Sequence, residues 1–347
     1  MQGESTAQKK TFRRALGDWF RASARDLPWR ETRSLYRTVI SEFMLQQTQV
    51  KTMLPYFDRW MQLFPDFETL AKAEEASVLK AWEGLGYYNR ARNLHKLAKA
   101  LTALPDVPQT PEAWQALPGV GPYSSAAISS LAQGYAAAVV DGNVVRVLAR
   151  ITGNRQCFES GAEAIEAIRP AADAFLDKQN PGLHNEAMME LGALICLKNN
   201  PSCMICPVQH CCRAFNEGTA ESIPNIQRKK TEKVLVERVL LENAAGEILL
   251  RKAPHTAKRL ANIYEFPTAE EVKVSLTGKA LLFKGSRGIA NQRIEERFYK
   301  IASDKQLEAH IAGDSLLEWI CEDRLEEIPL SGPHRKWLGK VIQAIEK

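Results

Sequence analysis

Five of the seven cysteines in this chain fall between positions 196 and 212. Cys196, Cys203, Cys206 and Cys212 have the spacing C-x6-C-x2-C-x5-C, and four thiolates this close in sequence can ligate zinc or an iron–sulfur cluster. Zinc sites usually contain two C-x2-C pairs separated by a longer loop. Because this chain has one such pair flanked by single cysteines, we predict a [4Fe–4S] cluster, with Cys211 either a bystander, which we favour, or a ligand in place of Cys212.

A glycine pair and an aspartate are the next residues that suggest chemistry. Gly119 and Gly121 lie in LPGVG (117–121), between two stretches with helical periodicity. Such a turn either connects two helices or also holds a phosphate with its backbone N–H groups and the dipole of the following helix. Asp141 precedes a helix predicted from Val144 onward. It is either the N-cap of that helix or a carboxylate that stabilises positive charge developing on a sugar.

The elements that must position these residues are mostly helices. Apolar residues recur at helical spacing almost continuously up to Cys212. The segment 224–233 contains a proline and a basic run, and it predicts a linker. Beyond it, VLVERVLL (234–241) and EILLRK (247–252) predict a β-hairpin through ENAAG, and 335–347 predicts a helix. We therefore predict a mainly α-helical domain over 1–223, with the cysteine loop at 196–212, and a smaller α+β domain over 234–347.

Composition narrows the class of protein. The chain has 347 residues, 45% of them hydrophobic and 25% charged, with a net charge of +5. This slight excess of basic residues permits a polyanionic partner without requiring one. No run approaches the roughly 20 apolar residues of a membrane span, and the polar N-terminus does not resemble a signal peptide. We therefore expect a cytoplasmic protein without a membrane partner, and the odd cysteine count argues against a disulfide framework.

The glycine turn, the aspartate and the cysteine loop, in this order, resemble the helix-hairpin-helix glycosylase superfamily in its endonuclease III-like branch. Further motifs resemble the MutY-type adenine DNA glycosylases more closely: LPWR at 27–30, SE followed by MLQQTQV at 41–50, and GLGYY followed by RARNLH at 84–95. The resemblance implies a six-helix barrel, a cluster domain and a C-terminal Nudix-like domain. It implies removal of adenine mispaired with 8-oxoguanine or guanine in double-stranded DNA, and we expect a monomer.

The resemblance also implies roles for individual residues in catalysis. Glu42 would protonate the adenine leaving group, because adenine leaves poorly until a ring nitrogen gains a proton. Asp141 would stabilise the positively charged sugar, Asn143 would orient Asp141, and Tyr123 would assist that step. Relatives that also cut the strand carry a lysine two residues after the second hairpin glycine, where it forms a Schiff base. Since Tyr123 occupies this position, we predict a monofunctional hydrolase.

A second set of residues would bind the DNA. The resemblance implies that Arg30 and Glu186 line the site of the flipped base. Gln47 would fill the gap left in the base stack, and Tyr88 would wedge beside the opposing base. Contacts with the DNA are also expected from three further residues, namely Thr48, Gly119 and Gly121.

The second domain departs from the family pattern. Segments 261–267 and 330–337 are similar to family segments, but the Phe-Ser-His loop that reads 8-oxoguanine is replaced by Ala290-Asn291-Gln292-Arg293. We find no intact Nudix hydrolase motif and expect this domain to recognise the mismatch rather than to act as a pyrophosphatase. Gln292 and Arg293 are either contacts to the opposing base or polar loop residues, and the second reading is slightly favoured.

Three other functions compete with adenine excision. A thymine or uracil mismatch glycosylase could use Tyr123 and Asp141, but it would not need the purine-protonating acid Glu42. A non-catalytic iron–sulfur DNA-binding protein would not need both acids. An endonuclease III-like lyase is disfavoured by Tyr123.

Overall fold

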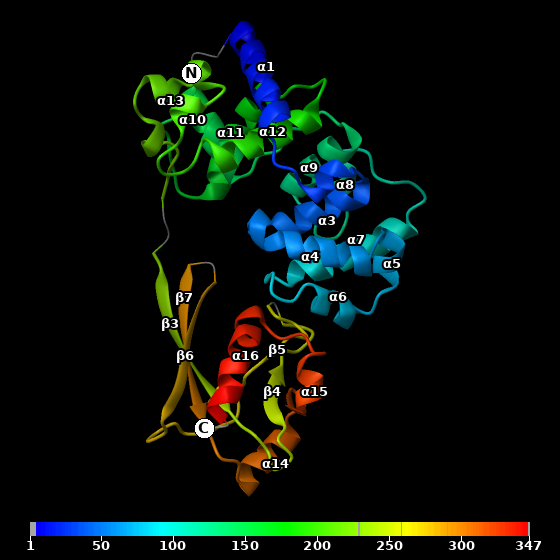
Figure 1. Ribbon diagram of the computed structural model, residues 1–347, viewed down its shortest axis with the longest axis vertical. Helices are drawn as coiled ribbons and strands as arrows, with labels where there is room; N and C mark the ends of the chain where they lie inside the picture. The colour runs from blue at the N-terminus through cyan, green and yellow to red at the C-terminus, as the bar shows by residue number, and fades with distance from the viewer. Residues whose placement is uncertain (1–4, 228–229, 258, 290, 346–347) are drawn as a thin grey trace. The chain divides into compact units, whose positions relative to one another are not determined.

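The computed structural model describes residues 5–227, 230–257, 259–289 and 291–345, with side chains described through residue 340. The chain forms two compact units, each built from two stretches of sequence (Figure 1). Unit 1 contains residues 1–46 and 100–228, and unit 2 contains residues 47–99 and 229–347. No helix among the described residues is long and apolar enough to cross a membrane.

Unit 1 is almost entirely helical. Its elements are α1 (Thr6–Ser23), α2 (Pro28–Glu31), α3 (Leu35–Leu45), α8 (Pro111–Gln115), α9 (Pro122–Gln133), α10 (Gly142–Thr152), β1 (Cys157–Phe158), α11 (Gly161–Phe175), α12 (Pro181–Leu194), the 3-10 turns η1 (Cys203–Ile205), η2 (Gln209–Cys211) and η3 (Ala220–Ser222), α13 (Arg213–Asn216) and β2 (Asn225–Ile226).

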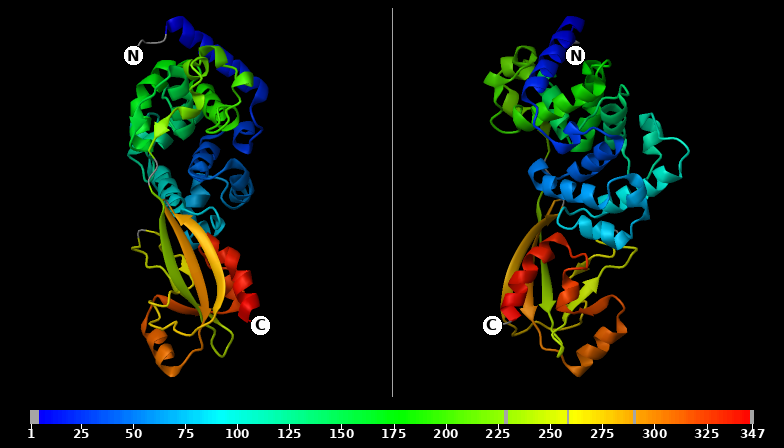
Figure 2. Two further views of the ribbon diagram at one scale, coloured as in Figure 1. Left: turned by 90° about the vertical axis from the view of Figure 1, so that its left-hand side faces the viewer. Right: turned by 45° about the vertical axis from the view of Figure 1, so that its right-hand side comes forward.

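The core of unit 1 lies where α1, α10, α11 and α12 meet (Figure 2). Phe12 of α1 meets Phe175 of α11 edge to face, with ring centroids 5.0 Å apart. On α10, Val144, Val147 and Leu148 are buried, as the helical spacing predicts. Burying this apolar face is the main source of stability for a helix of this length.

Unit 2 combines helices with two small sheets. Its elements are α4 (Val50–Leu63), α5 (Phe67–Lys72), α6 (Glu75–Ala81), most of α7 (Asn89–Ala103), β3 (Glu232–Leu240), β4 (Ile248–Lys252), β5 (Tyr264–Glu265), β6 (Leu281–Ile289), β7 (Gln292–Lys300), α14 (Lys305–Gly313), β8 (Leu317–Ile320), α15 (Glu322–Leu325) and α16 (Gly332–Ile345).

The predicted hairpin between β3 and β4 forms only at its turn. The N–H of Leu249 donates to the carbonyl of Leu241 at 3.0 Å, and Glu242 pairs with Ile248 in an isolated antiparallel bridge. The strands themselves belong to different sheets, ordered β3-β7-β6 and β5-β4-β8. β3 pairs in parallel with β7, which no local sequence signal indicates, and β4 lies between β5 and β8.

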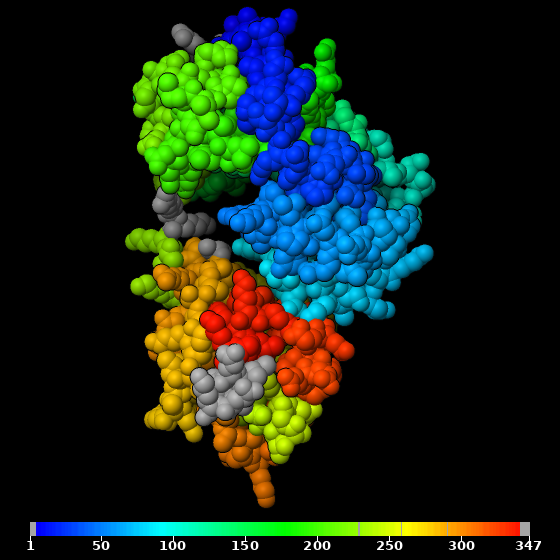
Figure 3. Space-filling view, viewed as in Figure 1, coloured from blue at the N-terminus to red at the C-terminus, as the bar shows by residue number. Residues whose placement is uncertain are grey.

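Helix α16 packs against β6 at a point that requires glycine. A Cβ added to Gly285 would lie 2.5 Å from the ring of Trp337, so the indole occupies the space that a side chain would need. Trp337 also meets Phe298 of β7, with ring centroids 5.7 Å apart. The surfaces of α16 and of β6 and β7 lie side by side in the space-filling view (Figure 3).

The mainly α-helical part and the α+β part match the predicted fold class. The helical segment 47–99 groups with the C-terminal residues in unit 2, while the division into domains 1–223 and 234–347 stays a prediction.

A network of charged side chains is buried between the sheets of unit 2. Arg238 of β3 donates to Glu296 of β7 and to Glu265 of β5, at 2.9 and 3.0 Å. Arg287 of β6 pairs with both glutamates, at 2.8 Å to Glu265 and 2.6 Å to Glu296. The two positive and two negative charges balance, as a buried cluster requires.

His334 of α16 completes this network in a defined tautomer. The N–H of Phe266 donates to Nδ1 of His334 at 2.9 Å, so Nδ1 carries no proton. The other nitrogen, Nε2, therefore carries the proton and donates to Glu296 at 2.9 Å. Burial lowers the pKa of His334, which favours this neutral form.

We expect Glu296→Gln to destabilise the protein by about 3–5 kcal/mol, because it leaves two buried guanidinium groups with one fewer negative charge. Urea denaturation followed by circular dichroism measures the change. The neighbouring Glu295→Gln is the matched control, since Glu295 pairs with Arg297 at the surface. Equal stability of the two variants would show that the network contributes no more than a surface ion pair.

Candidate active site

Three carboxylates, a tyrosine and an arginine converge in unit 1. Glu42 lies on α3, Tyr123 on the first turn of α9, Asp141 at the N-cap of α10 and Glu186 on α12. Contacts of α9 with α3 and α12, and of α10 with α12, bring these positions together although they are far apart in the chain. We call Glu42, Tyr123, Asp141 and Glu186, with Arg30 of α2, the acidic cluster.

Glu42 is buried, with 5% of its surface exposed. Burial raises its pKa to about 7; the Tyr123 hydroxyl opposes the rise through a hydrogen bond, and the negative charges of Glu186 and Asp141 add to it. Its Oε2 atom is buried and has no hydrogen-bond partner among the described residues. A carboxyl group in this state can hold a proton near neutral pH and give it to a nearby base.

Asp141 is both a helix cap and a member of the acidic cluster. Its Oδ1 accepts the N–H of Val144 at 2.7 Å, and its Oδ2 accepts the side-chain amide of Asn143 at 2.9 Å. The pKa of Asp141 is raised on balance, because burial outweighs these two hydrogen bonds, which act in the opposite direction. Hydrogen bonds and a helix N-terminus favour the charged carboxylate. The two interpretations of Asp141 in the sequence are therefore compatible.

Asn143 occupies a tightly packed position beside Asp141. A Cβ added to Gly192 of α12 would lie 2.5 Å from the Cβ of Asn143, so α12 approaches it closely only because residue 192 is glycine. The Oδ1 atom of Asn143 accepts a hydrogen bond from Arg146 at 2.9 Å. The side-chain amide of Asn143 is thus held at its nitrogen by Asp141 and at its oxygen by Arg146.

The remaining members of the acidic cluster form an ion-pair chain. Arg30 donates to Glu186 at 2.9 Å and to Glu190 at 3.1 Å. Arg33 pairs with Glu186 at 2.6 Å, and Arg25 pairs with Glu190 at 2.7 Å. Glu190 and Arg25 were not identified from the sequence, although Glu190 follows Glu186 by one helical turn.

Burial raises the pKa of Tyr123 well above its usual value, and the negative charges of Glu42 and Asp141 add to the rise. The hydroxyl therefore keeps its proton and acts only as a hydrogen-bond donor or acceptor at neutral pH. It also lies 3.5 Å from the sulfur of Met189.

The glycine turn joins α8 to α9 as predicted. Gly119 has a φ of 75°, a conformation that favours glycine, and Val120 is buried beneath the turn. Gly121 is the N-cap of α9, no side chain caps that end, and a Cβ added there would meet nothing within 4 Å. The backbone N–H groups at the start of α9 are therefore open to an anion.

Of the two residues predicted to enter the base stack, Gln47 is exposed and Tyr88 is not. Gln47 has a φ of 56°, and Thr48 follows it. Tyr88 is 2% exposed, and its hydroxyl donates to the carbonyl of Leu330 at 2.7 Å. The prediction of Tyr88 as a wedge is therefore wrong, because a residue buried against the C-terminal segment cannot reach DNA. Its neighbour Tyr87 is 53% exposed, with a φ of 51°.

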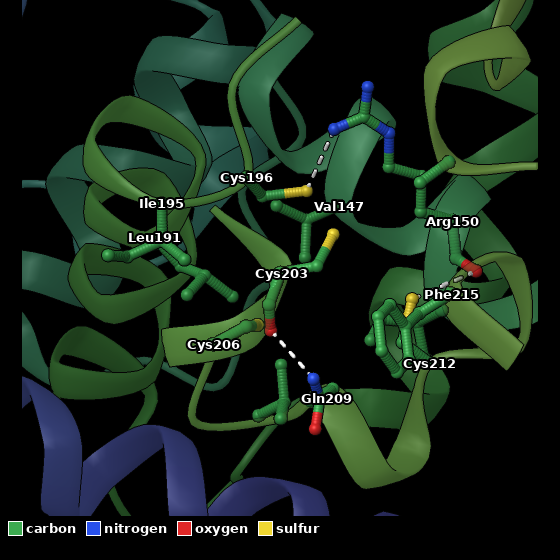
Figure 4. Close-up of a pocket in the computed structure, with 13 residues that line it drawn as sticks. Val147, Arg150, Leu191, Ile195, Cys196, Cys203, Cys206, Gln209, Cys212 and Phe215 are labelled. Carbon is green, nitrogen blue, oxygen red and sulfur yellow. Dashed lines mark hydrogen bonds between the residues drawn. The ribbon is translucent and has the colours of Figure 1, made fainter. Parts of the chain in front are cut away.

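The four predicted ligand cysteines surround one pocket (Figure 4). Most of its other lining residues are apolar, Val147, Leu191 and Phe215 among them, and Arg150 and Gln209 also line it. Arg150 of α10 donates to the sulfur of Cys196 at 3.2 Å and to the carbonyl of Leu197 at 2.6 Å. Cys211 is not among the residues that line this pocket, and its role as a bystander stays a prediction.

Four cysteines around one pocket supply the sulfur donors that zinc or an iron–sulfur cluster takes. Zinc holds its sulfur ligands at about 2.3 Å, which requires the four sulfurs to be nearly in contact. Among the described residues, no group of three or more His, Cys, Asp or Glu side chains is close enough to hold one ion. Burial raises the pKa of the Cys206 thiol to about 12, so this thiol is neutral unless a bound cation stabilises its thiolate.

The loop that replaces the family's Phe-Ser-His segment is described in part. Ala290 lies outside the described residues, and Asn291 precedes β7. The side-chain amide of Gln292 donates to Glu232 at 3.3 Å. Arg293 lies opposite Lys233 in the backbone register of the parallel strands β3 and β7.

Part of the chain is similar in sequence to known proteins. Residues 40–169 match the family of HhH-GPD superfamily base excision DNA repair proteins. Adenine DNA glycosylase from Homo sapiens is 41% identical over 219 residues, covering 60% of this chain and 40% of the relative. The Schizosaccharomyces pombe enzyme is 35% identical over 229 residues, covering 59% and 49%. The chain thus spans about half the length of the curated relatives it matches.

Two solved structures resemble the chain over a similar range. A thermostable thymine-DNA glycosylase has a TM-score of 0.54 and 28% identity, covering 61% of this chain and 98% of its own. A non-covalent endonuclease III–DNA complex has a TM-score of 0.52 and 20% identity, covering 62% and 99%, and supports the fold.

The raised pKa of Glu42 predicts a pH-dependent stability. In the unfolded chain the Glu42 carboxyl group is already ionised above about pH 5, whereas in the native protein it keeps its proton up to about pH 7. The free energy of unfolding should therefore fall by up to about 3 kcal/mol as pH rises from about 5 to 8. We expect Glu42→Gln to be more stable than the wild type at about pH 8 and to differ little at about pH 5. Thermal unfolding at both pH values measures this.

The control for this experiment is Glu112→Gln, at an exposed glutamate of α8. Its effect should be small and the same at both pH values. An equal effect of Glu42→Gln at both pH values would contradict the burial of an ionisable Glu42.

Proposed function

We propose that this chain is a DNA glycosylase that hydrolyses the bond between adenine and deoxyribose, because residues 40–169 match the HhH-GPD superfamily of base excision DNA repair proteins and the similar curated proteins are adenine DNA glycosylases. The observation that carries this proposal is the pairing of Glu42 with Asp141 in the acidic cluster. One carboxyl group is placed to hold a proton near neutral pH, and the other is held by hydrogen bonds that favour its charge. Such a pair divides the acid role from the charge-stabilising role.

In the proposed reaction, Glu42 gives its proton to a ring nitrogen of the flipped adenine. The bond between the base and C1′ of the sugar then breaks, and its electron pair leaves with the base. Asp141 stabilises the positive charge left on the sugar, with Asn143 holding the carboxylate in place. Water adds to C1′ and loses a proton, which leaves an abasic site. Positioned charges of this kind are usually the largest contribution to catalysis.

The proposed enzyme is monofunctional. Strand cleavage by this superfamily needs an amine that forms a Schiff base with C1′. Tyr123 occupies the corresponding position after Gly121, and its hydroxyl remains protonated. It is placed to hydrogen-bond to Glu42 and does not supply a nucleophile.

The proposed partner is double-stranded DNA with a mismatched adenine, bound by one monomer. Pro122 has no N–H, so the backbone donors proposed for a phosphate are those of Tyr123 and Ser124, in the first turn of α9, which no side chain caps. Gln47 and Tyr87 are exposed residues that would enter the base stack when the adenine leaves it, and filling the vacated space offsets part of the cost of flipping. We also propose that the C-terminal α+β part recognises the base opposite the adenine, including 8-oxoguanine.

We propose that Cys196, Cys203, Cys206 and Cys212 hold a [4Fe–4S] cluster. When bound, such a cluster supplies a rigid cross-link between four points of the chain and, in some proteins, electron transfer. Here its proposed role is structural. The loop that would hold it follows α12, which carries Glu186, and is tied to α10 through Arg150, so loss of the cluster should loosen the supports of the acidic cluster.

The substrate proposal is tested by single-turnover cleavage of duplexes carrying A opposite 8-oxoguanine, A opposite G, T opposite G and U opposite G, each followed by alkali. We expect product from the adenine duplexes only, and strand breaks only after alkali. Asp141→Asn and Glu42→Gln should each reduce the rate by at least about 100-fold while leaving DNA binding nearly intact.

Product from T opposite G without product from adenine pairs would identify a pyrimidine glycosylase instead. Strand breaks before alkali would contradict the monofunctional assignment. DNA binding without any base excision would favour a non-catalytic DNA-binding protein.

The cluster proposal is tested by iron and zinc analysis of protein purified without oxygen. We expect iron and sulfide at the stoichiometry of one cluster. Cys203→Ser should lose the iron and the brown colour, whereas the control Cys211→Ser should retain both, because Cys211 lies outside the pocket. Zinc in place of iron, or equal iron in the two variants, would contradict the ligand assignment.

A further inference from the structure

We propose that Arg90 is a positioning residue that holds Gln47 and Tyr87 in a fixed relation, so that both side chains meet the DNA as one preformed unit. This inference rests on the proposed function, because it assigns a role within the DNA contact. All three residues belong to unit 2.

The backbone at both exposed residues is strained. Gln47 and Tyr87 have φ values of 56° and 51°, in the left-handed region that residues with a side chain rarely adopt. Each such conformation costs on the order of 1 kcal/mol and persists only when its surroundings hold it in place. Two strained and exposed residues in one unit therefore imply a nearby group that maintains both turns.

Arg90 contacts both turns with one nitrogen. Its Nη2 donates to the hydroxyl of Thr48, to the carbonyl of Leu85 and to the carbonyl of Gly86, each at 3.2 Å. Thr48 directly follows Gln47, and Gly86 directly precedes Tyr87. The guanidinium group thus connects the two strained positions through their immediate neighbours.

Two aromatic rings also hold the guanidinium group of Arg90 in place. It lies over the ring of Trp82, 5.2 Å from its centroid, and over the ring of Tyr87 at 5.6 Å. Trp82 is fully buried, and its Nε1 donates to the carbonyl of Gly86 at 3.0 Å. Arg90 is itself 8% exposed. Planar stacking with several hydrogen bonds is a geometry that lysine cannot reproduce.

Arg90 remains charged in this environment. Burial lowers its pKa only to about 10, so the guanidinium group is a cation at neutral pH. Its attraction to the face of Tyr87 limits the rotation of that ring. A ring and an amide side chain that are already in position lose less conformational entropy on entering DNA than two mobile side chains.

The test is Arg90→Lys, read out by a fluorescent adenine analogue, 2-aminopurine, placed opposite G in a duplex. Fluorescence rises when the analogue leaves the base stack, and the measurement needs no bond cleavage. We expect wild-type protein to raise the fluorescence, and Arg90→Lys to lose most of the rise while retaining DNA binding. Excision of adenine from the same duplex should fall by roughly 10- to 100-fold. Thr48→Val, which removes one acceptor, should give a smaller loss.

A second substrate separates positioning from a general structural defect. Excision from a single-stranded oligonucleotide needs no opening of a stack, so the variant should approach the wild-type rate there. The matched control is Arg92→Lys, on the same helix, whose arginine pairs with Glu75 and Asn89. Arg92→Lys should behave as the wild type in both assays, and thermal unfolding checks that each variant is folded.

Equal losses on both substrates, or a full fluorescence rise with Arg90→Lys, would overturn the positioning role. Absence of a fluorescence rise with wild-type protein would overturn it as well, since Gln47 and Tyr87 would then not enter the stack. A rise without any base excision would instead contradict the proposed function and leave the inference standing.

Discussion

The burial of the Glu42 carboxyl group beside Asp141 is the interaction on which the site in unit 1 depends. Two carboxylates in one low-dielectric region cannot both be charged without cost. The helix cap settles which of them is more easily ionised, because the N–H of Val144 and the amide of Asn143 point at Asp141. Glu42 has a buried oxygen with no partner among the described residues, and it therefore holds the proton.

Helix α10 connects this arrangement to the cysteine pocket. Asp141 caps its N-terminus, Arg146 reaches both Asn143 and the carbonyl of Cys196, and Arg150 reaches the sulfur of Cys196. These side chains lie on one rigid element whose apolar face is buried in the core of unit 1. The position of the proposed charge-stabilising residue and the position of the cysteine loop are thus set by the same packing.

Unit 2 shows how a long-range contact can reverse the interpretation of a motif. Gly84-Leu85-Gly86-Tyr87-Tyr88 offers two adjacent tyrosines, and local sequence does not distinguish them. The C-terminal segment distinguishes them, because the hydroxyl of Tyr88 donates a hydrogen bond to the carbonyl of Leu330 and the ring of Tyr88 is buried. Tyr87 is left exposed, with Arg90 beneath it. The pairing of β3 with β7 is likewise made by residues 60 positions apart, from Glu232 with Gln292 to Leu240 with Lys300.

The sequence by itself determined the helical periodicity of α10, the cap at Asp141, the glycine turn before α9 and the set of four cysteines. These features depend on neighbours within a few residues, or on residue types that have few other uses, so they can be inferred without a fold. Tertiary structure alone decided that Glu42 is buried, that Glu190 and Arg25 support Arg30, that Tyr88 is covered and that β3 and β4 part into different sheets. Burial and pairing between distant segments depend on which surfaces meet when the chain folds, and no local pattern records this.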